Sequence, residues 1–280
     1  MIKTIAVIGA GTMGNGIAQV IAQNGFTALL FDINVEALQK AKDVISSSLQ
    51  FLLKKEKITD DEYNDILSRL IFINDINQCK ADFFIEAAVE KIEVKVQILN
   101  QLAAINPPDT IFATNTSSLS VSAIQSGIIN PCRVVGMHFF NPAPVMKLVE
   151  VVIGNQTEDA VAEKVCHLCR QLNKTPVLCE DAPGFIVNRV ARHYYLEAMQ
   201  LLEKGIADIE TIDAVMESTG FKMGPFKLID LIGMDINLAV SQSLYDAFKQ
   251  EIRFRPSVIQ KQKVANGELG KKTGKGFYQY

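Results

Sequence analysis

The apolar residues in the first part of the chain fall into short continuous runs separated by longer amphipathic stretches. Thr4–Ile8 and Thr27–Phe31 are typical of strands buried on both faces, and Asn15–Asn24 between them has helical periodicity. Similar runs predict further strands at Leu70–Ile73, Asp82–Ala87, Thr110–Thr114, Val134–Met137, Leu148–Ile153 and Thr175–Cys179. Because helical stretches alternate with these strands, we expect an α/β domain with a doubly wound, mostly parallel sheet.

After Asp181-Ala182-Pro183-Gly184 the pattern changes, and the remaining apolar positions have helical spacing. Residues that commonly begin and end helices delimit predicted helices at Ile186–Lys204, Asp208–Ser218, Pro225–Ile232, Asp235–Ile252 and Ser257–Ala265. We therefore predict two domains, an N-terminal α/β domain of residues 1–184 and an all-helical C-terminal domain of residues 185–280. The apolar stripes of the helical part are wider than a bundle of this size usually buries, which predicts a homodimer.

The turn between the first strand and the first helix is rich in glycine. Its sequence, Gly9-Ala10-Gly11-Thr12-Met13-Gly14, has the G-x-G-x-x-G spacing of a Rossmann-like dinucleotide site. Gly9 permits the tight turn, Gly11 lets the backbone approach a pyrophosphate, and Gly14 lets the helix pack closely on the strand. Asp32 ends the second strand, where a carboxylate accepts hydrogen bonds from ribose hydroxyls and repels a 2′-phosphate. The pattern predicts NAD as the cofactor, with NADP the weaker alternative.

A histidine and a glutamate stand on either side of a proline-rich turn. His138 follows the run Val134–Met137, and Glu150 lies inside the apolar run Leu148–Ile153. Asn141-Pro142-Ala143-Pro144 cannot continue either strand, so the chain must turn there. A charged carboxylate in a buried strand needs a partner, and we predict a His138–Glu150 pair that acts as a general base. The alternative is a core histidine and a carboxylate that are each satisfied separately.

Other polar residues are candidates for the same crevice. Asn115-Thr116-Ser117-Ser118 follows the strand Thr110–Thr114, so these side chains should also lie at the carboxyl edge of the sheet. Asn188 falls in the first turn of the first helix after Gly184, where its amide either faces the crevice or is simply exposed. Lys54, Lys55 and Lys57 form a basic face that is either solvated surface or a binding site for a phosphorylated ligand.

Composition and charge exclude several classes of protein. With 48% hydrophobic and 21% charged residues the chain can bury a core, and its net charge of −3 disfavours nucleic acid or an anionic membrane as a partner. No apolar run approaches the roughly 18 residues that cross a bilayer. The sequence enters a strand within a few residues of Met1, and the five cysteines are scattered, so we expect a cytoplasmic protein with reduced thiols. Cys166-His167-Leu168-Cys169 lacks a second ligand pair, so we expect no metal site.

Together these motifs resemble the L-3-hydroxyacyl-CoA dehydrogenase family, most closely its bacterial members that act on 3-hydroxybutyryl-CoA. The resemblance runs from the first strand to the last residues, and the blocks around His138 and Asn188 are its most specific parts. The matching segments are Gly9–Gly14 with Asp32, Ala87–Glu90, Asn115–Leu119, Met137–Pro142, Lys147–Glu150, Pro183–Arg189, Met223–Phe226 and Gly270–Gly274.

The resemblance implies roles for individual residues. His138 would be the general base and Glu150 its partner, while Ser117 and Asn188 would position the substrate oxygen. Ser48 and Lys55 would contact coenzyme A. The dinucleotide would contact the fingerprint, including Thr12 and Met13, and also Asp32, Glu90, Lys95, Asn115, Ser117, Asn141 and Lys272. The implied reaction interconverts 3-hydroxybutyryl-CoA and acetoacetyl-CoA with NAD(H), in fatty-acid and butyrate metabolism.

Two other interpretations of the sequence remain open, each with a different function. One is a hydroxyacid or sugar-acid dehydrogenase on the same scaffold, which would need no basic face for coenzyme A. The other is a nicotinamide-sensing or structural protein that keeps the fold without turnover. A buried carboxylate beside a histidine favours catalysis over the second, because a protein without turnover has no use for a costly buried charge.

Overall fold

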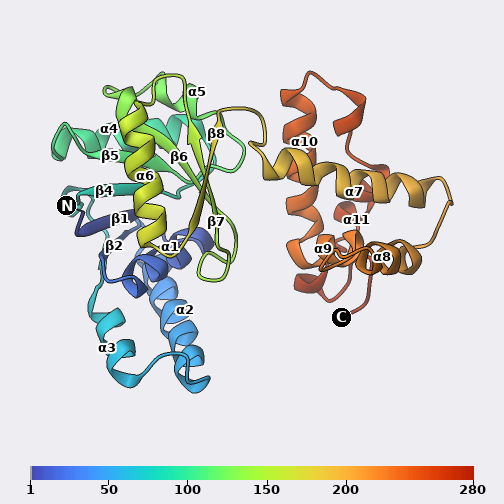
Figure 1. Ribbon diagram of the computed structural model, residues 1–280, viewed down its shortest axis with the longest axis horizontal. Coiled ribbons are helices and arrows are strands. Elements are labelled where there is room, and N and C mark those ends of the chain that lie inside the picture. The colour runs from blue at the N-terminus through green and yellow to red at the C-terminus, as the bar shows by residue number, and fades with distance from the viewer. Residues whose placement is uncertain (1) are drawn as a thin grey trace. The chain divides into compact units, whose positions relative to one another are not determined.

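The computed structural model describes residues 2–280, which divide into two compact units. The first unit ends at Ala182, and the second spans Pro183–Tyr280. The first contains the sheet and the second is helical (Figure 1).

A single sheet of eight strands organises the first unit. Its order is β3-β2-β1-β4-β5-β6-β7-β8, and every neighbouring pair is parallel except β6 and β7. This arrangement confirms the predicted doubly wound, mostly parallel sheet. The strands are β1 Thr4–Ile8, β2 Thr27–Phe31, β3 Leu70–Ile73, β4 Phe83–Glu86, β5 Ile111–Thr114, β6 Val134–Phe139, β7 Leu148–Ile153 and β8 Thr175–Glu180.

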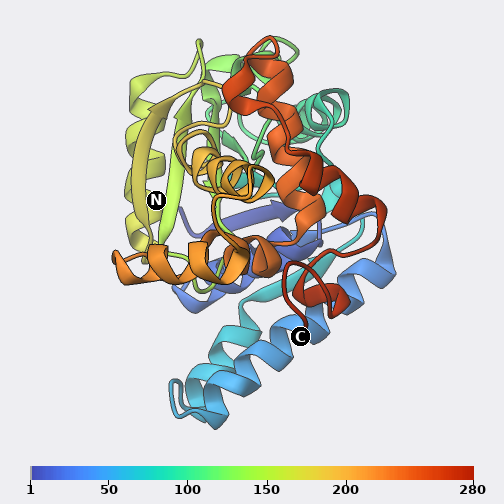
Figure 2. The same cartoon turned by 90° about the vertical axis from the view of Figure 1, so that its right-hand side faces the viewer.

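Helices cover both faces of this sheet because its strands are apolar on both sides. Ile5 and Val7 of β1 pack with α1, α2 and α6, whereas Ala6 and Ile8 pack against α4 and α5. The helices are α1 Thr12–Gln23, α2 Val35–Lys54, α3 Asp60–Ser68, α4 Ile92–Ile105, α5 Val121–Gln125 and α6 Asp159–Gln171, with 3-10 turns at Ile76–Gln78 and Pro131–Arg133. Helices α2 and α3 lie side by side and extend away from the sheet (Figures 1 and 2).

Strand β6 is longer than the sequence pattern indicates. We expected the strand to end at Met137 with His138 just beyond it, but β6 continues to Phe139. Antiparallel pairing with β7 is the reason, since Phe139 lies opposite Val149 and extends the ladder beyond the last parallel partner on β5. His138 is therefore held inside a strand, which fixes its backbone more firmly than a loop would.

The second unit is built from five helices and two short 3-10 turns in the described chain. The helices are α7 Val187–Glu203, α8 Ile209–Ser218, α9 Pro225–Ile232, α10 Met234–Ala247 and α11 Val258–Ala265, and the turns are Ile252–Phe254 and Lys271–Thr273. The predicted helix Asp235–Ile252 is too long, because Lys249 and Gln250 adopt positive φ values of 51° and 66° and end α10 early. Phe226, Ile229 and Met234 lie at the centre of the core of this unit.

Two buried carboxylates fix the end of the chain to this core. Asp230 accepts hydrogen bonds from the backbone N–H groups of Phe277 and Tyr278, at 2.9 Å each, and from the Tyr280 hydroxyl at 3.2 Å. Asp213 accepts from two N–H groups at the start of α9 and from the Tyr278 hydroxyl. Each charge is compensated by at least three donors, which is what burial of a carboxylate requires.

Over residues 2–280, no helix has the length and apolar character needed to cross a membrane. The same residues contain no group of three or more His, Cys, Asp or Glu side chains suited to a metal ion. Cys166 and Cys169 pack instead into the core beneath α6.

Candidate active site

His138 and Glu150 lie directly opposite each other on the antiparallel strands β6 and β7. Nδ1 of His138 is 2.8 Å from Oε2 of Glu150, and the two residues are 5% and 1% exposed. A carboxylate at this distance stabilises the tautomer with hydrogen on Nδ1, so Nε2 is the nitrogen suited to proton exchange with a ligand. The ring of Phe140 lies 4.5 Å from the imidazole, centroid to centroid, and limits its rotation. The predicted pair is present with the geometry of an oriented general base.

Lys174 holds the loop between β6 and β7 in place through hydrogen bonds to its backbone. Nζ of Lys174 donates hydrogen bonds to the carbonyl oxygens of Ala143 (2.6 Å) and Met146 (2.8 Å). Lys174 is 6% exposed. Burial lowers the pKa of its ammonium to about 8, and the nearby charge of Lys147 adds to the effect. The loop also presses on α1, where a Cβ on Gly16 would lie 3.2 Å from atoms of Ala143 and Pro144.

Asn115 joins the ends of β5 and β6. Its side-chain oxygen accepts a hydrogen bond from the backbone N–H of Phe139 at 2.8 Å. This bond replaces ladder pairing just beyond the last β5–β6 partners and fixes the backbone next to His138. Asn115 therefore supports the site whether or not its amide nitrogen also contacts a cofactor.

The glycine-rich turn has the geometry of a phosphate-binding loop. Gly9 has φ +106°, and a Cβ at Gly14 would lie 1.7 Å from the Gly9 carbonyl oxygen, so both positions require glycine. A Cβ at Gly11 would meet no atom within 4 Å, which leaves room for a ligand to approach the backbone. No side chain caps the N-terminus of α1, so its N–H groups suit an anion. Thr12 and Met13 form the first turn of this helix.

A cavity of about 840 Å³ adjoins this turn. Asp32 lies in its wall, where one carboxylate oxygen accepts from the backbone N–H of Ala10 (2.8 Å) and the other from that of Asn34 (2.9 Å). These bonds hold the carboxylate next to the glycine turn. Other lining residues are Gly9, Gly11, Phe31, Ala87 and Val89.

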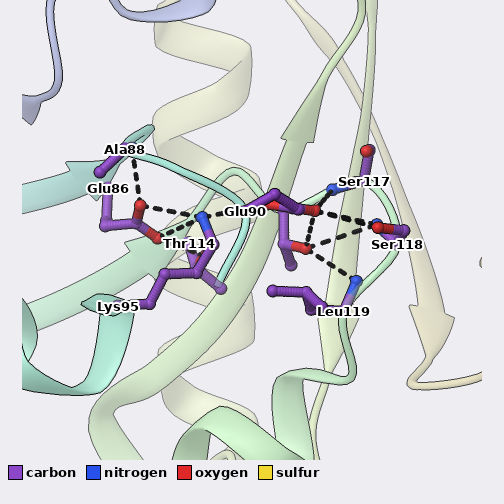
Figure 3. A network of polar contacts seen from close by, with 9 residues as sticks. Glu86, Ala88, Glu90, Lys95, Thr114, Ser117, Ser118 and Leu119 are labelled. Atoms are coloured by element: carbon purple, nitrogen blue, oxygen red, sulfur yellow. Dashed lines mark hydrogen bonds and ion pairs between the residues drawn. The ribbon is translucent and has the colours of Figure 1, made fainter. Parts of the chain in front are cut away.

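Glu86 and Lys95 form a buried ion pair near the carboxyl ends of β4 and β5 (Figure 3). Glu86, at the end of β4, is fully buried and places both carboxylate oxygens 2.9 Å from Nζ of Lys95 in α4. Glu86 also accepts hydrogen bonds from the Thr114 hydroxyl and the Ala88 N–H, both at 2.7 Å. The pair joins β4, β5 and α4 at the carboxyl edge of the sheet.

Glu90 extends this network to the loop that carries Ser117. One oxygen of Glu90 lies 3.2 Å from Lys95 Nζ, and the other accepts from the Thr116 hydroxyl (2.5 Å) and the N–H of Ser117 (3.0 Å) (Figure 3). Burial alone would raise the pKa of Glu90, but the Lys95 charge and these hydrogen bonds lower it. Glu90 is therefore a carboxylate that shapes the Ser117 loop.

Lys95 is a predicted cofactor contact that is almost fully buried. Its side chain is 1% exposed and its ammonium is engaged by Glu86 and Glu90. Any influence of Lys95 on a dinucleotide would pass through Glu90. Its contact with the cofactor stays a prediction.

The remaining predicted residues are distributed over both units. In α2, the half-buried Ser48 accepts a hydrogen bond from Gln19 at 3.1 Å, and Lys55 at the helix end is exposed near the ring of Phe51. Asn141 is exposed in the loop after β6. In the second unit, Asn188 lies in the first turn of α7, and Lys272 pairs with Asp235, with N–O distances of 2.5 and 2.6 Å.

Sequence reasoning missed two residues that shape the site, Glu86 and Lys174. Glu86 carries the same signal that identified Glu150, a carboxylate within an apolar run, and could have been found in the same way. Lys174 carries no such signal, because its carbonyl partners lie about thirty residues earlier in the chain.

The fold and these residues define a dinucleotide-binding oxidoreductase. The model for the NAD-binding domain of 3-hydroxyacyl-CoA dehydrogenase matches residues 4–182, and that for the C-terminal domain of the same enzymes matches residues 184–280. The chain therefore belongs to the 3-hydroxyacyl-CoA dehydrogenase family, whose N-terminal domain binds NAD.

The names of similar proteins agree with this assignment. A 3-hydroxyadipyl-CoA dehydrogenase of Escherichia coli is 51% identical over the whole chain, which spans 59% of that protein's length. A probable 3-hydroxybutyryl-CoA dehydrogenase of Deinococcus radiodurans is 41% identical over 98% of this chain and 99% of its own. The crystal structure of (S)-3-hydroxybutyryl-CoA dehydrogenase from Ralstonia eutropha superposes with a TM-score of 0.95 at 41% identity, covering 100% of this chain and 99% of that one.

Proposed function

We propose that this protein reversibly oxidises (S)-3-hydroxyacyl-CoA to 3-oxoacyl-CoA with NAD⁺. The observation that carries the proposal is the His138–Glu150 pair, whose nearest side-chain nitrogen and oxygen are 2.8 Å apart. The pair lies in the same sheet as β1, the strand that leads into the glycine-rich dinucleotide turn. An oriented imidazole supplies the base that oxidation of a secondary alcohol requires. Membership of the family supplies the substrate class.

In the proposed mechanism, Nε2 of His138 accepts the proton of the 3-hydroxyl group as the C3–H bond breaks and the C3 carbonyl forms. Bound NAD⁺ supplies the acceptor for the hydride that leaves C3. Glu150 stabilises the imidazolium that results and prevents the ring from turning. In the reverse direction, protonated His138 returns the proton, while Ser117 and Asn188 donate hydrogen bonds to the oxygen on which negative charge develops.

We further propose how the other residues divide between the two ligands. The turn Gly9–Gly14 would hold the pyrophosphate and Asp32 the adenosine ribose. Ser48 and Lys55 would contact coenzyme A. The nicotinamide side would be lined by Glu90, Lys95, Asn115, Ser117, Asn141 and Lys272.

The two units have different proposed roles. Residues 1–184 would form the NAD-binding domain, and residues 185–280 would contribute to substrate binding and to a homodimer interface. Exposed apolar side chains on the helical unit, including Val190, Val215 and Ile236, support an interface with a second copy. We expect the protein to act in the cytoplasm.

The proposed substrate is 3-hydroxybutyryl-CoA, in fatty-acid and butyrate metabolism, as for the Deinococcus and Ralstonia relatives by name. The name of the Escherichia coli relative adds a second candidate substrate, 3-hydroxyadipyl-CoA, whose acyl chain is longer and ends in a carboxylate. Both share the thioester and the 3-hydroxyl group, so the chemistry at His138 would be the same.

Mixing the purified protein with NADH and acetoacetyl-CoA tests the proposal directly, because oxidation lowers the absorbance of the reduced nicotinamide. Acetoacetate without coenzyme A is the matched control. Rapid oxidation with the thioester alone supports the proposal. Oxidation of the free acid at a similar rate would favour a hydroxyacid dehydrogenase, and no oxidation by protein that binds NADH would favour a sensor.

A further inference from the structure

Arg192 is a buried cation in the helical unit. It lies on the inner face of α7 and is 3% exposed. Its Nη1 donates hydrogen bonds to the backbone oxygen of Asn237 (3.0 Å), the side-chain oxygen of Asn237 (3.1 Å) and the hydroxyl of Ser241 (3.1 Å). The guanidinium also lies 5.2 Å from the centre of the Tyr195 ring. All of these partners are neutral.

Most other deeply buried charges of the described chain are compensated more fully. Lys174 is the exception among the described residues, since it also lacks a carboxylate partner, but its ammonium donates to two carbonyl oxygens and is not left without a hydrogen bond. Lys95 is paired with Glu86, and Asp213 and Asp230 each accept three hydrogen bonds. Arg192, by contrast, has no carboxylate within 4.0 Å in the part of the chain that the structure describes. Its Nε is the one buried side-chain nitrogen or oxygen there without a hydrogen-bond partner. Burial lowers the pKa of this guanidinium to about 10.

The surroundings of Arg192 contain more donors than acceptors. The amide nitrogen of Gln260 donates to the same two acceptors, the side-chain oxygen of Asn237 (2.6 Å) and the hydroxyl of Ser241 (3.0 Å). The Ser241 hydroxyl is itself turned toward the carbonyl of Asn237. A buried charge with neutral partners costs free energy that a carboxylate would offset. The cluster therefore has the chemistry of a binding site for a carboxylate.

The position of Arg192 along α7 indicates where such a carboxylate would come from. Arg192 follows Asn188 by one helical turn, so the two residues share a face of the helix and lie about 6 Å apart along its axis. The proposed function assigns the 3-oxygen of the substrate to Asn188. This face packs against α10, so an acyl chain inserted between α7 and α10 from the Asn188 end would bring its far end to the guanidinium.

We propose that Arg192, with Asn237 and Ser241, binds a carboxylate at the far end of the substrate's acyl chain. The preferred substrate class is then a 3-hydroxyacyl-CoA whose acyl chain ends in a carboxyl group. The inference rests on the proposed function, because Asn188 is the reference point for the acyl chain.

The test compares 3-oxoadipyl-CoA with 3-oxohexanoyl-CoA, which have equal chain lengths and differ in the terminal group. We expect a higher kcat/KM for the carboxylate in the wild-type protein, and the ratio of the two values should fall by about 10- to 100-fold in Arg192→Met, the range of a charge-assisted hydrogen bond. Arg253→Met removes an exposed arginine paired with Glu251 and should leave the ratio unchanged. A wild-type ratio at or below one would overturn the inference, even if Arg192→Met failed to fold.

Binding of adipyl-CoA and hexanoyl-CoA separates this inference from the proposed function, since neither thioester has a 3-oxygen to react. Tighter binding of adipyl-CoA to the wild-type protein, lost in Arg192→Met, supports the carboxylate site even if no NADH oxidation is observed. Equal binding of the two, alongside normal reduction of acetoacetyl-CoA, overturns the site and leaves the dehydrogenase intact. Conversion of the dimer to monomer in Arg192→Met, with an unchanged substrate ratio, would assign the missing carboxylate to a second copy and also overturn the inference.

Discussion

Glu86 and Lys95 form a fully buried ion pair in which both carboxylate oxygens lie 2.9 Å from the ammonium nitrogen. The pair fixes α4 to the end of β4, and Glu90 carries the same network to the loop of Ser117 (Figure 3). Two parts of the site that are remote in the sequence, the end of β4 beside the cavity and the Ser117 loop, are thereby held by one set of charges. Its removal should affect both stability and cofactor binding.

Glu86→Gln should destabilise the protein by about 3–5 kcal/mol, because Lys95 would remain buried without its main partner. Urea unfolding followed by circular dichroism measures this change. Glu93→Gln, an exposed change on the same helix, is the matched control and should shift stability by less than about 0.5 kcal/mol. Equal unfolding midpoints for the two variants would show that the buried pair contributes nothing to stability.

Glu150→Gln should lower turnover by about 10²–10⁴, the range of general acid–base catalysis, with little change in NADH affinity. A neutral amide still occupies the position opposite His138 but no longer stabilises the imidazolium. Stopped-flow NADH oxidation gives the turnover, and fluorescence titration gives the affinity. Glu180→Gln at the exposed end of β8 is the control. Near-wild-type turnover in Glu150→Gln would refute a catalytic role for the pair.

Asp32→Ser should reduce the preference for NADH over NADPH by at least about tenfold. The carboxylate, held by Ala10 and Asn34, repels a 2′-phosphate, and a hydroxyl group does not. Competitive titration with the two reduced dinucleotides measures the ratio. Asp43→Asn, an exposed change on α2, should leave it unaltered. Tighter binding of NADPH than NADH to the wild-type protein would contradict the assignment of Asp32.

Lys174 should make stability depend on pH in the alkaline range. Its pKa is about 8 in the folded protein, against an ordinary value of 10.5, so between these values the unfolded chain holds more protons. The free energy of unfolding therefore gains a contribution as pH rises, which is fully present above about 10.5 and is lost as pH falls through about 8.

The comparison with Lys174→Met isolates this contribution. The unfolding free energy of the wild type relative to the variant should increase between pH 8 and 10, measured by urea denaturation at several pH values. Lys164→Met, an exposed change on α6, should show a constant difference over the same range. If the difference in unfolding free energy between the wild type and Lys174→Met did not change with pH, Lys174 would titrate normally. It would then not hold the 143–146 loop as a buried ammonium.

The sequence by itself determined the features that arise from local pattern. Continuous apolar runs alternating with helical stretches were enough to predict the doubly wound sheet and the helical second unit. The glycine spacing after β1 was enough to predict the dinucleotide turn. The His138–Glu150 pair could be predicted because two strands joined by a proline-rich turn can pair directly, and a carboxylate in a buried strand needs a partner.

Only the tertiary structure decided which charges are shared between distant segments. Lys174 donates to carbonyl oxygens of the loop at Ala143, and Lys95 is enclosed by two glutamates. Arg192 is buried against α10, with no carboxylate partner among residues 2–280. In sequence these residues look like ordinary charges beside apolar neighbours. The energy of a buried charge depends on what packs around it in three dimensions, and helical or strand periodicity contains no information about those long-range partners.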